Sequence, residues 1–360
     1  MASRSSGKRK KCNEKCVPGS PSPKTPLANS TADHENDERA TKRIRELASS
    51  LSEELFCTIT HELMVDPVVA DDGNMYERSA IVQWLQTKTK SPLDPSTTID
   101  PSRLIGSRAI FKSIEKLVIS GDIDENLSSD WLARKKKFDL VKAQTLYDEG
   151  RVLEAANLGL PRAQGKMGSY YLHGDHGFAK DADKSFEFST KAAEAGDVYG
   201  QFRLGYLYDQ GIGTAKDWRA ALKWYARAAE QRCLASTNNI GSIYFKGGHG
   251  VQRDFKAAFA WCEKAAVGWS AGAQAMLGEI FYHGMGVAKD MTAAWKWHKR
   301  SSDQGFSRGQ RCLGTMIVKG EGGSESLGAG VILLEKAAAQ GDATATGLLS
   351  GIKELAVGWS

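Results

Sequence analysis

The side chains best suited to chemistry in this 360-residue sequence are its six cysteines, which are potential zinc ligands or nucleophiles. A structural zinc site needs two pairs of Cys or His residues at short spacing. Cys12 and Cys16 have no second pair to complete such a set, and the other four stand singly at positions 57, 233, 262 and 312. The pattern favours single buried thiols, and we expect neither a metal nor a cofactor.

The charge distribution argues against nucleic-acid binding. Residues 1–45 hold eleven Lys or Arg and five Asp or Glu, a balance of +6, so the rest of a chain of net charge +5 carries −1. A nucleic-acid surface needs its basic residues on a folded face. We therefore expect residues 1–46 to be a disordered basic tail. Its run Lys8-Arg9-Lys10-Lys11 fits either a nuclear import signal or a solvated tail.

The apolar residues are spread in short runs. No window approaches 18 consecutive apolar residues, and the first residues lack the apolar stretch of a secretory signal. We expect no membrane partner, and a cytoplasmic or nuclear protein.

Residues 47–120 show the mixture of short strands, turns and helices of a small α+β module. In a helix, Ile81, Trp84 and Leu85 would share one side. Asp71-Asp72-Gly73-Asn74 is typical of a tight hairpin turn. The expected elements are a strand at 68–69, a helix over 78–86, a Pro-rich loop over 91–101 and an amphipathic helix over 109–119.

An internal repeat dominates the last 200 residues. A glycine recurs at Gly168, Gly205, Gly241, Gly278, Gly314 and Gly351, at spacings of 37, 36, 37, 36 and 37 residues. Each unit predicts two helices, the second beginning near an Asp and ending, after an alanine pair, at a glycine in the left-handed conformation. We expect an all-α solenoid with five units over 160–342 and a half-unit cap over 343–360.

One position of the second helix carries a large apolar side chain in every unit. A ligand-binding row of rings is one interpretation, but regular spacing favours packing between successive helix pairs. The residues are Phe188, Trp224, Trp261, Trp297 and Leu333.

Residues 121–159 are predicted to form a helical connector. Its basic run from Arg134 to Lys137 fits a solvated helix face better than a binding patch. Such a connector would set the distance between whatever its two neighbours bind.

The α+β module resembles a U-box, and the repeats resemble Sel1-like repeats, as in LGYLYDQGIG…KDWRAALKWYARAAE of the second unit. The first resemblance implies a zinc-free RING-like fold that docks a ubiquitin-conjugating enzyme carrying ubiquitin and positions its thioester for attack. The second implies a solenoid whose concave face binds a protein substrate. The segments that carry the U-box resemblance are Phe56-Cys57-Thr58-Ile59-Thr60, Asp66-Pro67-Val68, Tyr76-Glu77-Arg78, Ile81, Trp84-Leu85, Ser91-Pro92-Leu93-Asp94 and Leu104-Ile105.

The U-box resemblance also implies a docking surface for the conjugating enzyme. It consists of Ile59 and His61 in a first loop, Trp84 on the helix and Pro92 in a second loop. No residue of this chain is expected to be catalytic in the sense of a nucleophile.

Three positions depart from the U-box pattern. Thr58 stands where the family usually has Pro, and Gly106-Ser107 replaces a usual Pro-Asn. Pro95 stands where many active members have a basic residue that clamps ubiquitin, a role for which Lys90 is a substitute candidate.

Three alternatives to a non-covalent ligase remain open at this point. Cys57 is a candidate thioester-forming nucleophile of another ligase class. Pro95 motivates a non-enzymatic scaffold with a degenerate U-box. Sel1-like repeats also occur in adaptors of membrane-associated degradation complexes.

Overall fold

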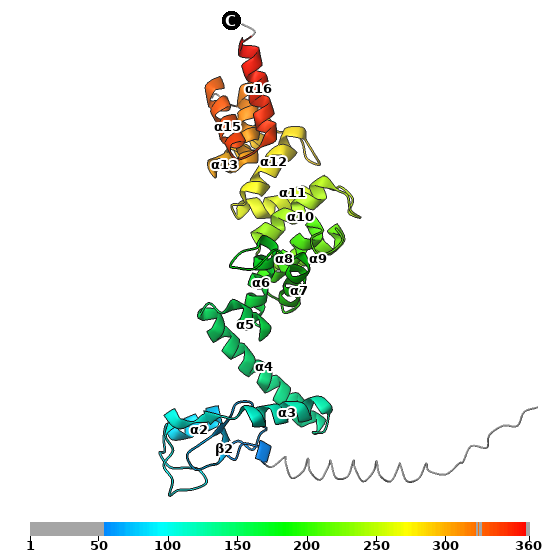
Figure 1. The fold of residues 1–360 in the computed structure, drawn as a ribbon. Helices are drawn as coiled ribbons and strands as arrows, with labels where there is room; N and C mark the ends of the chain where they lie inside the picture. Colours follow the sequence, from blue (N-terminus) through cyan, green and yellow to red (C-terminus); the bar gives the residue numbers. More distant parts are fainter. Residues whose placement is uncertain (1–53, 322, 324–325, 358–360) are drawn as a thin grey trace, which may run out of the picture. The chain divides into compact units, whose positions relative to one another are not determined.

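The computed structural model describes residues 54–321, 323 and 326–357, and the chain divides into two compact units at Ala133 and Arg134. The expected basic tail over 1–46 lies outside the described residues. Figure 1 labels the main elements of each unit.

The first unit is built on a three-stranded sheet in the order β2-β1-β3. Val68 of the central strand faces Tyr76 on one side and Gly106 on the other, and both pairings are antiparallel. Gly73, with φ +77°, forms the turn between β1 and β2, since only glycine adopts this conformation without strain. The elements are β1 (Pro67–Val69), β2 (Met75–Glu77), α2 (Arg78–Leu85), the short 3₁₀ helix η1 (Pro101–Arg103), β3 (Ile105–Gly106) and α3 (Arg108–Ser120).

Sheet and helices enclose a small apolar core. Val68, Tyr76, Ile81 and Ile114 are fully buried and come from β1, β2, α2 and α3. The predicted α+β module is therefore confirmed, with α2 ending one residue earlier than expected and α3 one residue longer at each end.

Helix α4 (Glu125–Asp148) begins in the first unit and continues into the second. Its Trp131 is only 1% exposed, and its ring centroid lies 5.9 Å from that of Phe111 in α3. The indole Nε1 donates a hydrogen bond to the backbone oxygen of Met64 at 3.0 Å. The core of the first unit therefore includes a residue beyond 120.

The second unit is a solenoid of helix pairs that follow one another in chain order (Figure 1). A short helix α5 (Val152–Asn157) precedes it, and α16 (Ala343–Val357) ends it. The pairs are α6 (Pro161–His173) with α7 (Ala182–Glu194), α8 (Val198–Gln210) with α9 (Trp218–Glu230), α10 (Leu234–Lys246) with α11 (Phe255–Val267), α12 (Ala271–His283) with α13 (Met291–Asp303), and α14 (Ser307–Val318) with α15 (Leu327–Ala339).

The repeated glycines lie where the two helices of a pair touch. A Cβ added to Gly205 would lie 2.7 Å from the ring of Tyr225, and one added to Gly278 would lie 2.4 Å from the ring of His298. A side chain of the second helix thus packs directly on the backbone of the first. The expected Asp caps are also present, since Asp181, Asp217, Asp254 and Asp290 each accept a backbone N–H at the start of the second helix.

The turn after the second helix differs from the prediction in two units. A left-handed glycine is found there at Gly196 and Gly305, with φ +87° and +79°. In the second and third units the left-handed position is occupied by Arg232 and Trp269 instead, with φ +66° and +69°. The expectation of a glycine at every such turn is therefore wrong. The left-handed residue is always the second one after the helix, and where that residue is not glycine its side chain adopts this conformation despite the steric cost.

The recurring aromatic position packs on one side only. Trp261 packs on the apolar cluster between α9 of the preceding pair and α10 of its own pair, and Trp297 does the same between α11 and α12. All five side chains are half-buried, and the fully buried position of the helix is one residue further on. A cation covers the outer side, as where Lys264 Nζ lies 4.7 Å from the Trp261 ring centroid.

Candidate docking site

The first loop of the α+β unit is a tight turn closed by its own backbone. Cys57 N–H donates to the oxygen of Glu62 at 2.9 Å, and His61 N–H donates to the oxygen of Cys57 at 2.7 Å. His61 adopts the left-handed conformation, with φ +57°, and its side chain is exposed. Ile59 is half-buried in the same turn. Both predicted residues of this loop are thus accessible to a partner.

The end of the first loop is attached to the start of α2. The Glu77 carboxylate accepts hydrogen bonds from the backbone N–H groups of Val65, at 2.7 Å, and Asp66, at 3.2 Å. Arg78 Nε lies 2.8 Å from the Asp66 carboxylate. Because Glu77 precedes the helix and Arg78 begins it, α2 and the first loop share one polar network.

The second loop is attached to the sheet through Asp72. The hydroxyls of Ser91 and Tyr76 donate to one Asp72 oxygen at 2.5 and 2.6 Å. Burial alone would raise the pKa of Asp72, but these hydrogen bonds outweigh burial and hold the pKa below its ordinary value. Burial and the bond to Asp72 raise the pKa of Tyr76 to about 12. The buried start of the loop is therefore held by a carboxylate that stays ionised.

The exposed part of the second loop has its own carboxylate. Asp94 accepts hydrogen bonds from the Ser96 N–H and hydroxyl and from the Thr97 hydroxyl. Hydrogen bonds from Ser96 and Thr97 lower the pKa of Asp94 to about 2. These side-chain hydrogen bonds hold the exposed part of the loop in shape.

Trp84 joins α2 to the second loop. Its Nε1 donates to the backbone oxygen of Lys90 at 2.9 Å, and Lys88 Nζ lies 4.3 Å from its ring centroid. Trp84 and Pro92 are both half-buried, so neither is sealed in the core. Helix α2 is thereby attached to the first loop at its start and to the second loop at its end.

Two aliphatic side chains outside the four predicted residues are also exposed in the first unit. Leu93 in the second loop is 51% exposed, and Ile105 in β3 is 71% exposed. Neither was predicted from the sequence as a docking residue, although an exposed aliphatic side chain inside an otherwise polar loop is a usable signal.

The departures from the expected pattern have defined positions. Thr58 and Pro95 are exposed, and Gly106 takes part in the sheet opposite Val68. Lys90 Nζ donates to the backbone oxygen of Ser96 at 3.2 Å, so its ammonium group already spans the second loop.

Cys57 has the surroundings of a structural thiol. It is 0% exposed, and its Sγ accepts the Glu77 backbone N–H at 3.2 Å. A thioester-forming cysteine has to be reached by another protein's thioester, which this burial prevents.

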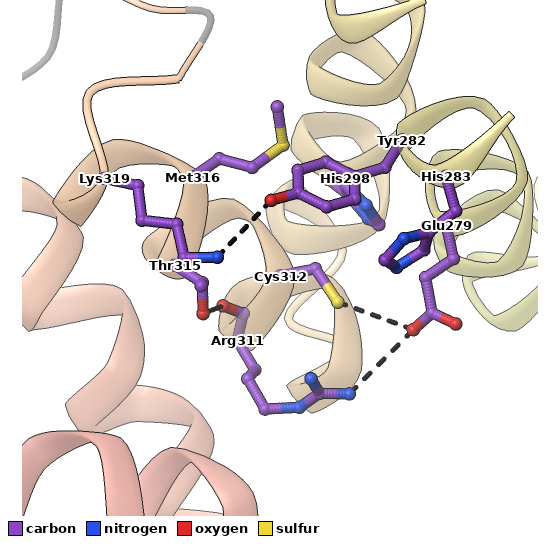
Figure 2. Close-up of a pocket in the computed structure, with 9 residues that line it drawn as sticks. All are labelled: Glu279, Tyr282, His283, His298, Arg311, Cys312, Thr315, Met316 and Lys319. Carbon is purple, nitrogen blue, oxygen red and sulfur yellow. Dashed lines mark hydrogen bonds and ion pairs between the residues drawn. The ribbon is translucent and has the colours of Figure 1, made fainter. Parts of the chain in front are cut away.

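A cavity of about 210 Å³ in the repeat array also brings Cys and His side chains together (Figure 2). Burial raises the pKa of Cys312 to about 12 and lowers that of His298 to about 4. The thiol stays protonated and the imidazole stays neutral, so these two do not form a nucleophile and base pair. Across the cavity, Cys312 points to the Glu279 carboxylate, and Lys319 Nζ donates to the Tyr282 hydroxyl at 3.4 Å (Figure 2).

The described part of the chain covers residues 54–357, apart from positions 322, 324 and 325. Within that part of the chain, no three His, Cys, Asp or Glu side chains gather as metal ligands would. Over the same described residues, no helix combines the length and apolar character that crossing a membrane requires.

Comparison with known families identifies both parts of the chain. Residues 51–120 match the U-box domain. The Sel1 repeat matches five times, at 161–197, 198–233, 234–266, 271–306 and 308–342.

Individual relatives resemble parts of the chain. The human WD repeat, SAM and U-box domain-containing protein 1 is 38% identical over 68 residues, which are 18% of this chain and 14% of that protein. The probable bifunctional E2/E3 enzyme R795 of Acanthamoeba polyphaga mimivirus is 42% identical over 62 residues, 17% of this chain and 4% of the viral one. The chain thus spans a small part of the curated relatives it matches.

A solved structure resembles the repeat array. The Sel1 repeat protein from Oxalobacter formigenes aligns with 59% of this chain and 89% of its own, with a TM-score of 0.51 and 29% identity.

Proposed function

We propose, from the premise that this chain is a U-box protein with five Sel1 repeats, that it is a ubiquitin ligase. Its U-box docks a ubiquitin-conjugating enzyme charged with ubiquitin, and its repeats hold the protein substrate. The observation that carries the proposal is the pair of loops attached to the two ends of α2, with Ile59 and Pro92 accessible on the loops and Trp84 on the helix.

The proposed chemistry is catalysis by positioning. The ligase forms no covalent bond with ubiquitin, and the buried Cys57 is consistent with that. A docked carrier presents its thioester to a substrate lysine at high effective concentration and in a reactive conformer. The polar networks of Asp72, Glu77 and Asp94 support this by holding both loops in shape before the carrier arrives.

A self-ubiquitination assay tests the proposal. The full-length protein is incubated with ubiquitin, activating enzyme, ATP and a panel of conjugating enzymes, and chain formation is followed over time. Ile59→Ala and Trp84→Ala should each reduce the rate by about tenfold or more, because small interfaces depend on one or two anchors. Ile119→Ala is the matched control, since Ile119 is an exposed aliphatic residue on α3. Unchanged rates in both loop variants would refute the docking surface.

The assignment of substrate binding to the repeats has a separate test. Deleting residues 160–360 should preserve self-modification and abolish the capture of substrate proteins. Capture by the truncated chain would contradict this division of labour.

Pro95 favours a second candidate function, a scaffold that docks the conjugating enzyme without activating it. Proline lacks a donor to hold ubiquitin, and the nearby Lys90 ammonium already bonds to Ser96. Measurable docking of several conjugating enzymes without chain formation by any of them would support the scaffold over the ligase.

A further inference from the structure

The repeat array contains a buried cation without a carboxylate partner. Arg203 in α8 is only 8% exposed, and its Nε has no hydrogen-bond partner among the described residues. Its other nitrogens contact Ser169 Oγ at 3.1 Å, His173 Nε2 at 3.4 Å and the Tyr199 hydroxyl, none of which is negatively charged. Burying a charge costs free energy unless an opposite charge offsets it.

Arginines near the other end of the array have carboxylate partners. There Glu279 accepts a hydrogen bond from Arg308 Nε at 2.7 Å, and Asp342 accepts one from Arg311 Nε at 3.0 Å. Glu279 directly follows its repeat glycine, and the residue in the same place of the first unit is Ser169. The first unit thus presents a hydroxyl to Arg203 where the fourth presents a carboxylate to Arg308.

Two further cations lie on α6, the helix that contacts Arg203 through Ser169 and His173. Arg162 and Lys166 precede Ser169 and His173 on α6 at spacings that place all four on one side of the helix. The charged groups of Arg162 and Lys166 lie 5.4 and 4.6 Å from the Tyr147 ring centroid. Among the described residues neither they nor Arg203 has an acidic group within ion-pair distance. The basic face is defined as Arg162, Lys166, Ser169, His173 and Arg203.

We propose that the basic face binds an anionic side chain of the substrate protein, within an acidic or phosphorylated segment. The proposal rests on the proposed function, in which the repeats hold the substrate, and it names the chemistry of that substrate. An entering carboxylate or phosphate reaches the guanidinium past Tyr199 and His173, which are both exposed. The unpaired Nε then donates to one oxygen of the anion, and Nη2 donates to the other by exchanging its bond to the exposed Tyr199 hydroxyl.

Fluorescence anisotropy with the full-length chain tests this proposal. The probe is a labelled dodecapeptide with three consecutive Glu residues among Gly, Ser and Leu. Two further peptides replace these Glu residues with Gln, or the central one with phosphoserine. The Glu peptide should bind at least about tenfold more tightly than the Gln peptide, and more weakly as salt increases. Tighter binding of the phosphoserine peptide would identify phosphate as the preferred anion at the same face.

Variants of the basic face identify the residues responsible. Arg203→Met should weaken binding of the anionic peptides by about tenfold or more, and Lys166→Gln by a few fold. Arg203→Lys keeps the positive charge but loses the planar guanidinium, so an intermediate loss of affinity is expected. This variant replaces Arg203→Met in the test if circular dichroism shows that the Met variant does not fold. Arg227→Gln is the control, because Arg227 lies on α9 over Trp224.

The outcomes separate this proposal from the ligase itself. Equal affinity for the Glu and Gln peptides, no binding of any anionic peptide, or full affinity in a folded Arg203→Met variant would each overturn the basic face as an anion site. Self-ubiquitination should be unchanged in the Arg203 variants, since the U-box carries that activity. If the native chain bound the acidic peptide but showed no self-ubiquitination, the ligase proposal would be wrong and the anion site would still be supported.

Discussion

The indole Nε1 of Trp84 donates a hydrogen bond to the backbone oxygen of Lys90 at 2.9 Å. Trp84 belongs to α2, and Lys90 begins the loop that contains Pro92. The same side chain therefore has two roles in the proposed docking site: its ring offers apolar surface, and its N–H holds the second loop against the helix. A substitution that separates these roles shows how much docking depends on the position of the loop.

Trp84→Phe keeps an aromatic ring and removes the N–H. Losing one hydrogen bond of this kind costs about 1 kcal/mol, so the dissociation constant for the conjugating enzyme should rise about fivefold. Isothermal titration calorimetry with an unloaded conjugating enzyme measures this, and Trp84→Ala should weaken docking further because the ring is lost as well. Trp224→Phe, at a half-buried tryptophan of the repeat array, provides the control. An affinity in Trp84→Phe equal to that of the native chain would show that the loop does not depend on this bond.

Trp131 holds the first loop from a position outside the matched U-box segment. Its N–H bonds to the Met64 oxygen, just after the turn that carries Ile59 and His61. Trp131→Phe leaves that buried oxygen without its donor and should lower the free energy of unfolding of the first unit by about 1–2 kcal/mol. Trp131→Ala should cost about 3–5 kcal/mol because it also leaves a cavity. Urea unfolding followed by circular dichroism measures both, and equal losses for the two variants would contradict a separate contribution from the hydrogen bond.

Acid should destabilise the U-box through Asp94. Its pKa in the folded chain is about 2, below the ordinary value of 3.8, so the unfolded chain binds more protons between those values. The carboxylate therefore stabilises the fold fully above about pH 4, and this contribution is lost as the pH falls toward about 2. Asp94→Asn should flatten the pH dependence of urea unfolding over this range and leave it unaltered above pH 5. A native-like slope between pH 4 and 2 in Asp94→Asn would assign the acid sensitivity to other groups, of which Asp72 is the first candidate.

Periodic features of the fold were predictable from the sequence because they repeat or follow local rules. The helix predicted over 78–86 is found at Arg78–Leu85, and the Asp caps of the repeats lie where their spacing places them. Such features depend on residues close together in the chain, so a single sequence contains the information. Ile59, Trp84 and Pro92 are half-buried, and their role in docking stays a prediction.

Contacts between distant residues were not predictable in the same way. Trp131 and Met64 are 67 residues apart, and Arg203 meets Ser169 34 residues earlier. Repeat spacing indicates which residues share a face of the solenoid, but not which side chain contacts which. Local sequence rules also fail at Trp269. The glycine before it suggested the usual left-handed cap, but in the structure the tryptophan is the left-handed residue, with φ +69°.

The repeated glycines have different packing, which a matched pair of substitutions reveals. A Cβ at Gly278 would lie 2.4 Å from the His298 ring, whereas one at Gly351, the same landmark in the last half-unit, meets no atom within 4 Å. Gly278→Ala should therefore force α12 and α13 apart and lower the free energy of unfolding of the array by about 1–3 kcal/mol. Gly351→Ala lies inside a helix with open space around it and should raise that free energy by about 0.5–1 kcal/mol. Thermal unfolding of the two variants beside the native chain measures the difference in sign. Two losses of similar size would contradict the open surroundings of Gly351.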